Sequence, residues 1–113
     1  MSRDYRIYLE DIEKAIAKVQ QYTSDLSFEG FAESDLRIDA VLRNLEVIGE
    51  AVKKVPQSLK RDYPDVEWKK IAGLRDILVH EYFGVDLEII WDVIENHLPV
   101  LRGQVERMIR HEE

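Results

Sequence analysis

The sequence predicts an all-α protein, an up-and-down bundle of four to five helices. Three observations predict this class: apolar residues recur every three or four positions over long stretches, capping residues and helix stops separate these stretches, and no stretch alternates between apolar and polar residues. With 113 residues and 45% hydrophobic composition, the chain is long enough to bury one core. We therefore expect a single helical domain over residues 1–113.

The first half of the chain predicts two long amphipathic helices. In residues 3–22, apolar side chains recur at helical spacing, namely Tyr5, Tyr8, Ile12, Ile16 and Val19. A break at residues 23–30 follows, and Ser34 is a plausible N-cap for a second helix that ends before Pro56. That helix carries a narrow seam with steps of three and four: Ile38, Val41, Leu45, Ile48 and Val52. The seam suits packing inside the bundle or against a second copy of the chain, and we favour the first.

The second half predicts shorter elements. Residues 57–63 allow one or two helical turns, and we expect Asp65 to cap a third helix that carries Trp68, Ile71, Leu74 and Leu78. Gly84 is a good stop signal and Asp86 a good cap for the last helical segment. Pro99 divides that segment and should kink it or begin a new helix after residues 96–97.

The charge distribution argues against a protein that coats nucleic acid by bulk charge. The net charge is −7, but residues 51–75 carry seven basic and three acidic side chains, a local +4. This segment, which includes Lys69 and Lys70, is either a local site for a polyanion such as RNA or ordinary solvated surface. The chain has no cysteine and no apolar run of membrane-spanning length, so we expect a cytoplasmic protein without disulfides and without a membrane segment.

The most informative cluster is Arg75-Asp76-Ile77-Leu78-Val79-His80-Glu81-Tyr82, near the end of the third helix. Arginine offers a planar fork of donors for phosphate, and histidine titrates near neutral pH, so the pair suits phosphate chemistry. A structural alternative is that Arg75 pairs with a carboxylate and His80 caps its helix. His80-Glu81 begins like a zinc-protease motif, but Gly84 stands where the second histidine is required, so we expect no metal and no cofactor.

Arg75 and His80 cannot share one face of a regular helix. Five residues correspond to roughly 500°, which places the two positions about 140° apart around the axis. Either the helix unwinds before His80, or the active centre combines residues of two chains across a dimer cleft. We favour the dimer, because a two-fold axis brings two copies of one helix end together.

Three segments carry a resemblance to a known family. The residues Arg75 to Tyr82 match an R-x4-H-x-Y signature. The three segments around and within it are Leu45-Glu46-Val47-Ile48-Gly49-Glu50-Ala51, Trp68-Lys69-Lys70-Ile71-Ala72-Gly73-Leu74-Arg75-Asp76 and Glu81-Tyr82-Phe83-Gly84-Val85-Asp86. Together these segments resemble the HepT-like family of the HEPN superfamily over almost the whole chain. One position departs from the pattern: the residue after the arginine is often Asn in that superfamily and is Asp76 here.

The resemblance implies a function and its partners. It implies a homodimer, or a larger assembly built from it, whose metal-independent endoribonuclease centre uses Arg75 and His80 with Asp76 in a supporting role. It further implies the toxin of a toxin–antitoxin pair that cleaves RNA, with transfer RNA as the suggested target. The antitoxin would be a MntA-like nucleotidyltransferase that adds AMP to Tyr82.

A competing interpretation is a helical adaptor without catalytic activity, which dimerises and binds a nucleotidyltransferase. A nucleotide-binding helical module has less support, because only the basic segment offers contacts for phosphate.

Overall fold

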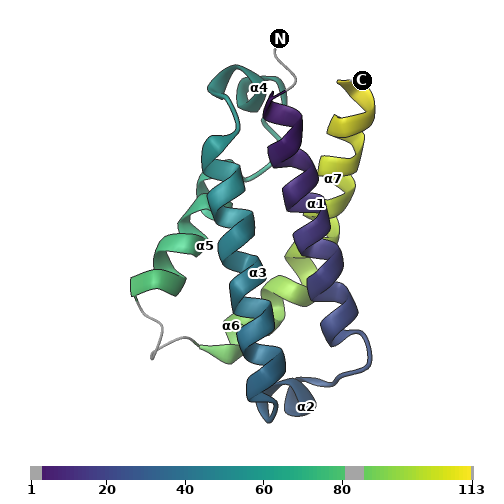
Figure 1. Ribbon diagram of the computed structural model, residues 1–113, viewed down its shortest axis with the longest axis vertical. Helices are drawn as coiled ribbons and strands as arrows, with labels where there is room; N and C mark the ends of the chain where they lie inside the picture. The colour runs from purple at the N-terminus through teal and green to yellow at the C-terminus, as the bar shows by residue number, and fades with distance from the viewer. Residues whose placement is uncertain (1–3, 81–85, 113) are drawn as a thin grey trace.

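The computed structural model describes residues 4–80 and 86–112, and most of these residues are helical (Figure 1). Four long helices form the body of the molecule: α1 (Asp4–Thr23), α3 (Asp35–Lys54), α5 (Trp68–His80) and α7 (Leu98–His111). Between them lie the short helices α2 (Phe28–Ala32), α4 (Gln57–Asp62) and α6 (Leu87–Asp92), and the π-helix η2 (Val93–His97), which joins α6 to α7.

Successive long helices run in opposite directions, and the two ends of the chain lie at the same end of the bundle (Figure 1). The prediction of an all-α up-and-down bundle is confirmed. The short helices bring the number of helical elements in the described ranges above the predicted four to five.

The core is formed by the apolar faces that the sequence pattern marks. The side chains of Ile12, Ile16 and Val19 in α1 are fully buried, and α1 packs along both α3 and α7. In the predicted seam of α3, the residues Val41, Leu45, Ile48 and Val52 are fully buried, and Ile38 is half-buried against the same core. The seam therefore packs within the chain, as the sequence analysis favoured.

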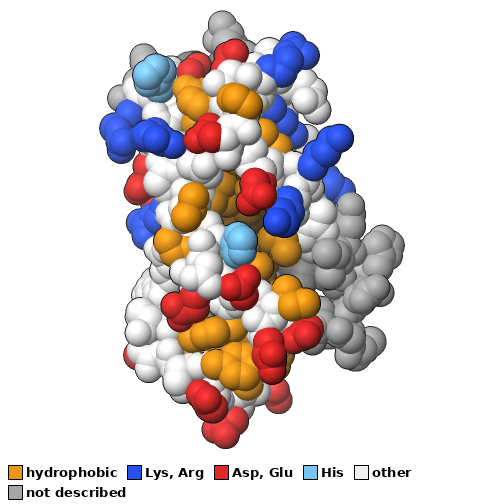
Figure 2. All heavy atoms as spheres, turned by 180° about the vertical axis from the view of Figure 1, so that it is seen from behind, with side chains coloured by type: hydrophobic (Ala, Val, Ile, Leu, Met, Phe, Trp, Pro, Cys, Tyr) orange, Lys and Arg blue, Asp and Glu red, His pale blue; other side chains and the backbone are white. Residues whose placement is uncertain are grey.

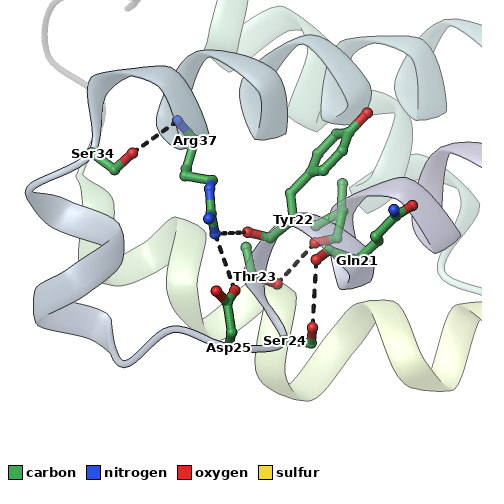
Figure 3. Close-up of polar contacts among 8 residues, drawn as sticks. Gln21, Tyr22, Thr23, Ser24, Asp25, Ser34 and Arg37 are labelled. Atoms are coloured by element: carbon green, nitrogen blue, oxygen red, sulfur yellow. Dashed lines mark hydrogen bonds and ion pairs between the residues drawn. The ribbon is translucent and has the colours of Figure 1, made fainter.

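Arg37 fixes the corner between α1 and α3 (Figure 3). Its Nη1 donates to the carbonyl oxygen of Tyr22 at 2.7 Å and to Oδ1 of Asp25 at 3.1 Å. The predicted cap of α3 is also present, since Ser34 Oγ accepts a hydrogen bond from the backbone N–H of Arg37 at 3.2 Å. The guanidinium of Arg37 lowers the pKa of Asp25. One arginine thus ties the end of α1 to the start of α3.

The prediction that Asp65 caps the third helix is wrong. Helix α5 begins at Trp68, and a tight turn, in which the N–H of Trp68 donates to the carbonyl of Val66 at 2.9 Å, separates Asp65 from it. Asp65 instead contacts α7: its Oδ2 accepts from Gln104 Nε2 at 3.3 Å and lies 3.4 Å from Arg107 Nη2. The carboxylate therefore joins the start of α5 to α7.

Helix α7 begins at Leu98, next to Pro99, so of the two predicted outcomes, a kink or a new helix, the structure has the second, and a π-helix precedes it. The backbone N–H of Leu98 donates to the carbonyl of Val93, five residues back, where a regular α-helix would use four. Pro99 has no N–H to donate and stands in the first turn of α7, where none is needed. Asp86 caps α6 as predicted, its side chain accepting from the N–H of Glu88 at 2.9 Å. Within the described ranges, none of the helices is both long and apolar enough to cross a bilayer.

Candidate functional site

Helix α5 carries the predicted catalytic residues, and Trp68 anchors its first turn. The indole is 8% exposed, and its Nε1 donates to the carbonyl of Tyr63 at 3.0 Å. Lys60 Nζ, on α4, lies 5.9 Å from the centre of the same ring, and partial burial lowers the pKa of this lysine. From this anchor α5 packs along α3, and its far end leaves the body of the bundle (Figure 1).

Arg75, Asp76 and His80 lie on the second half of α5, where the structure describes the backbone but not the side chains. Tyr82 falls outside the described residues. Because α5 is helical as far as His80, the alternative in which the helix unwinds before this residue is wrong. The positions of Arg75 and His80 therefore stay about 140° apart on one helix, and a single copy does not bring them to one face.

The register of α5 places each predicted residue on a particular stripe of the helix. Arg75 is seven positions after the buried Trp68, so the two lie within about 20° of one another around the axis. His80 is eleven positions after Lys69, which is exposed, and these two also lie within about 20°. Asp76 precedes His80 by four positions, the spacing of neighbours on a helix surface. The register thus associates Asp76 with His80 rather than with Arg75.

A groove of about 570 Å³ runs beside the first half of α5, between this helix and the segment from α6 to α7. Figure 2 shows this face, where a hollow with an apolar floor lies between charged side chains. Its lining includes Ile71, Leu74, Val93, Leu98 and Leu101. Charges of both signs also line it, namely Asp65, Glu67, Lys70 and Asp92. Two further lining residues are large and exposed: Ile89 and Val100 are each 60% exposed.

The π-helix η2 brings a histidine and a carboxylate together at this groove. His97 Nε2 lies 3.3 Å from Asp92 Oδ2, and Asn96 Nδ2 donates to Asp92 Oδ1 at 2.6 Å. The amide of Asn96, together with His97, lowers the pKa of Asp92. All three side chains are exposed.

The two lysines that the sequence marks as RNA-binding candidates differ in their surroundings. Both are exposed and lie in the first turn of α5. Lys70 lines the groove, and its Nζ lies 3.6 Å from Glu67 Oε2. Lys69 lies outside the groove lining, and no carboxylate of the described residues forms an ion pair with it.

In the part of the chain that the structure describes, no group of three or more His, Asp or Glu side chains is arranged to hold a metal ion.

Sequence reasoning missed the groove and its exposed apolar residues. Ile89 and Val100 come from α6 and α7, and the intervening π-helix sets their relative positions. The adjacent Ile89 and Ile90 of α6 gave no signal by themselves, because a helix can bury such a pair, as α3 does with Val41 and Leu42. Ile90 is 3% exposed and Ile89 is 60% exposed.

Comparisons with known proteins agree on one family. The family described as "Ribonuclease HepT-like" matches residues 12–108. A protein of Thermococcus cleftensis named "Probable ribonuclease HepT" is 40% identical over 108 residues, which cover 96% of this chain and 98% of the relative.

Two further relatives carry the printed name "Putative RNase". The one from Methanocaldococcus jannaschii is 42% identical over 96% of this chain and 89% of its own length, and the one from Caldanaerobacter subterraneus is 41% identical over 95% and 96%. No solved structure matches the chain.

Proposed function

The chain belongs to the HepT-like ribonuclease family, and from this premise we propose that it is a metal-independent endoribonuclease, the toxin of a toxin–antitoxin pair. The membership confirms the resemblance found in the sequence, and with it ribonuclease as the class of enzyme. The observation that carries the proposal is the Arg75-x4-His80 pair on one continuous helix within the matched range.

The chemistry of RNA cleavage assigns a task to each residue. His80 removes the proton of the 2′-hydroxyl, the 2′-oxygen forms a bond to phosphorus, and the bond from phosphorus to the 5′-oxygen breaks as that oxygen takes up a proton. Arg75 donates to the phosphorane oxygens, which carry extra negative charge in the transition state. Asp76, one helical turn before His80, is a positioning residue that holds the imidazole in its reactive orientation.

Two copies of the chain supply one centre. Since a single α5 separates Arg75 and His80 by about 140°, the arginine of one copy meets the histidine of the other across a two-fold axis. The groove beside α5 is the surface that we assign to the second copy. Its apolar floor and the exposed side chains of Ile89 and Val100 would be buried by a second copy, and its lining carries Lys70, whose charge is opposite to that of Asp65, Glu67 and Asp92 in the same groove. Three carboxylates against one lysine make the groove net acidic, which disfavours RNA there.

Tyr82 is the position at which we propose regulation. A MntA-like nucleotidyltransferase transfers AMP from ATP to the phenol oxygen of Tyr82, and pyrophosphate leaves. The added phosphodiester carries a negative charge and considerable bulk two residues from His80, so it repels the substrate phosphate and blocks its approach. Transfer RNA is the target that the family resemblance suggests.

The decisive experiment incubates purified protein with total RNA in EDTA. The wild type should cleave, and His80→Ala should lower the rate by about 10²–10⁴-fold with an unchanged melting temperature. His111→Ala is the matched control, because His111 is exposed at the far end of α7 and should leave cleavage unchanged. Equal activity of His80→Ala and wild type would overturn the nuclease assignment.

A second experiment separates the toxin from the adaptor. The protein is co-expressed with a MntA-like nucleotidyltransferase, and its intact mass is measured and followed by peptide mapping. Added AMP on Tyr82 together with loss of cleavage supports regulation of an enzyme. A wild type that is inert before modification but binds the transferase tightly supports the adaptor.

A further inference from the structure

The first half of α5 contains a glycine that no packing contact explains. Gly73 stands in the middle of a helix, where glycine costs roughly 0.8–1 kcal/mol relative to alanine. A Cβ built at Gly73 would meet no atom of the described residues within 4 Å. Packing among these residues therefore does not require a glycine at this position. Another reason for a glycine is the close approach of a ligand to the helix backbone.

Gly73 lies on a stripe of α5 that joins Lys69 to His80. Counting along the helix, Gly73 is four positions after Lys69 and seven before His80, and all three positions fall within about 40° around the axis. The stripe is roughly 16 Å long, since each residue advances the helix by about 1.5 Å. A strand of RNA with its scissile phosphate at His80 would therefore reach Lys69 after a few nucleotides.

Lys69 is better suited than Lys70 to hold a phosphate on this stripe. Among the described residues Lys69 has no ion-pair partner, whereas Lys70 lies beside Glu67 and faces the groove. Lys60 Nζ lies over the ring of Trp68, the residue before Lys69, so a second cation stands close to the same end of α5. Asp76 also falls on the stripe, between Gly73 and His80, where the proposed function gives it the task of positioning the imidazole.

We propose that Lys69 binds an RNA phosphate a few nucleotides from the cleaved one, and that Gly73 is the low floor over which the RNA backbone passes between Lys69 and His80. This inference rests on the proposed ribonuclease function and extends it. It assigns RNA binding to Lys69 and not to Lys70, and it places the RNA strand along α5.

The first test compares Lys69→Ala with Lys70→Ala in binding of bulk transfer RNA, each in the His80→Ala background so that the RNA stays intact. Lys69→Ala should weaken binding about tenfold, the effect of one charge-assisted contact. It should also reduce the slope of log K against log salt by about 0.7, the value for one phosphate of a single strand. Lys70→Ala should change neither quantity by a comparable amount. Equal effects of the two lysines would overturn the proposal.

The second test uses Gly73→Ala, with Gly103→Ala as its control. Gly103 lies on α7, is exposed, and also has open space where a Cβ would stand. Both substitutions should stabilise the fold, because alanine favours helix over glycine. Only Gly73→Ala should lower RNA cleavage and binding, by roughly three- to tenfold, and a more stable variant with lower activity cannot owe its loss to misfolding.

Sedimentation of the Gly73→Ala variant tests whether RNA or a second copy of the chain packs over Gly73. Dimers that form normally while RNA binding falls support the proposal, and dimers that dissociate overturn it. Failure of the underlying function has a different signature. An inert wild type that nevertheless binds transfer RNA through Lys69 would refute the nuclease and keep the site.

Discussion

The interface between α1 and α3 and the groove beside α5 are built from the same kinds of residue, yet the chain closes only the first. Between α1 and α3, Ile16 and Leu45 are fully buried, and Arg37 ties the two helices together at one corner. Beside α5, the apolar Leu74 is only half-buried, and Ile89 across the groove is mostly exposed. The interface between α1 and α3 therefore stabilises the fold of one chain. The groove beside α5 keeps apolar area exposed, which we propose a second copy of the chain buries.

Of two matched leucine-to-alanine substitutions, only the one between α1 and α3 should strongly lower the free energy of unfolding. Leu45→Ala removes a fully buried side chain and should cost about 2–5 kcal/mol of unfolding free energy, measured by urea denaturation at low protein concentration. Leu74→Ala, at the open groove, should cost below about 1 kcal/mol for the monomer and should weaken self-association instead. Equal losses of unfolding free energy would show that the groove is part of the folding core.

Two arginines extend the comparison to catalysis. Arg75→Lys keeps the charge but loses the planar fork, so cleavage should fall by about 10²-fold or more without a change in melting temperature. Arg102→Lys is the control, because Arg102 of α7 bonds to Gln20 and lies 3.3 Å from Glu13 on α1. This control should lose up to about 1 kcal/mol of stability and keep its cleavage rate. Cleavage by Arg75→Lys at the wild-type rate would contradict the phosphate-binding role.

A charged residue introduced into the groove should weaken self-association of the chain. Ile89→Glu would place two like charges near a two-fold axis, and self-association should weaken by at least about tenfold, measured by analytical ultracentrifugation. RNA cleavage should fall with it, because the proposed centre combines residues of both chains. Leu36→Glu is the control: Leu36 is 78% exposed on α3 and does not line the groove. Dissociation by Leu36→Glu alone would place the dimer interface elsewhere.

Much of this fold follows from local signals in the sequence. The helical spacing of apolar residues gives the buried faces of α1 and α3, and Ser34 and Asp86 cap their helices as predicted. Asp65 was misassigned because two features outside the local pattern determine its role: the tight turn before Trp68, and the side chains of Gln104 and Arg107 roughly forty residues away.

The candidate site follows from the sequence only in part. The sequence pattern around Arg75 and His80 identifies the motif residues and the family. Helix geometry then shows that one α5 cannot place both side chains on the same face. The groove could not be predicted, because its shape depends on how the π-helix sets α6 against α7. The meeting of the two side chains across a dimer stays a prediction.

The smallest expected effect concerns the C-terminal end of α7, where two tyrosines form hydrogen bonds to Glu112. Tyr63 Oη donates to Glu112 Oε2 at 2.9 Å, and Tyr5 Oη donates to Oε1 at 3.4 Å. Burial, together with this carboxylate, raises the pKa of Tyr63 to about 12. Burial and the same carboxylate also raise the pKa of Tyr5. An ultraviolet titration of the phenols should therefore show a late phase that is smaller in Tyr63→Phe and comes earlier in Glu112→Gln.

The same shift sets the pH dependence of stability. Because the pKa of Tyr63 is higher in the folded protein than its unfolded value of about 10, its contribution is complete below pH 10 and is lost as the pH rises through about 12. The stability difference between wild type and Tyr63→Phe should be constant from neutral pH to about pH 10 and shrink above it. A difference that grows above pH 10 would mean that Glu112 does not hold the neutral phenol, and that the C-terminal turn is fixed by its apolar contacts alone.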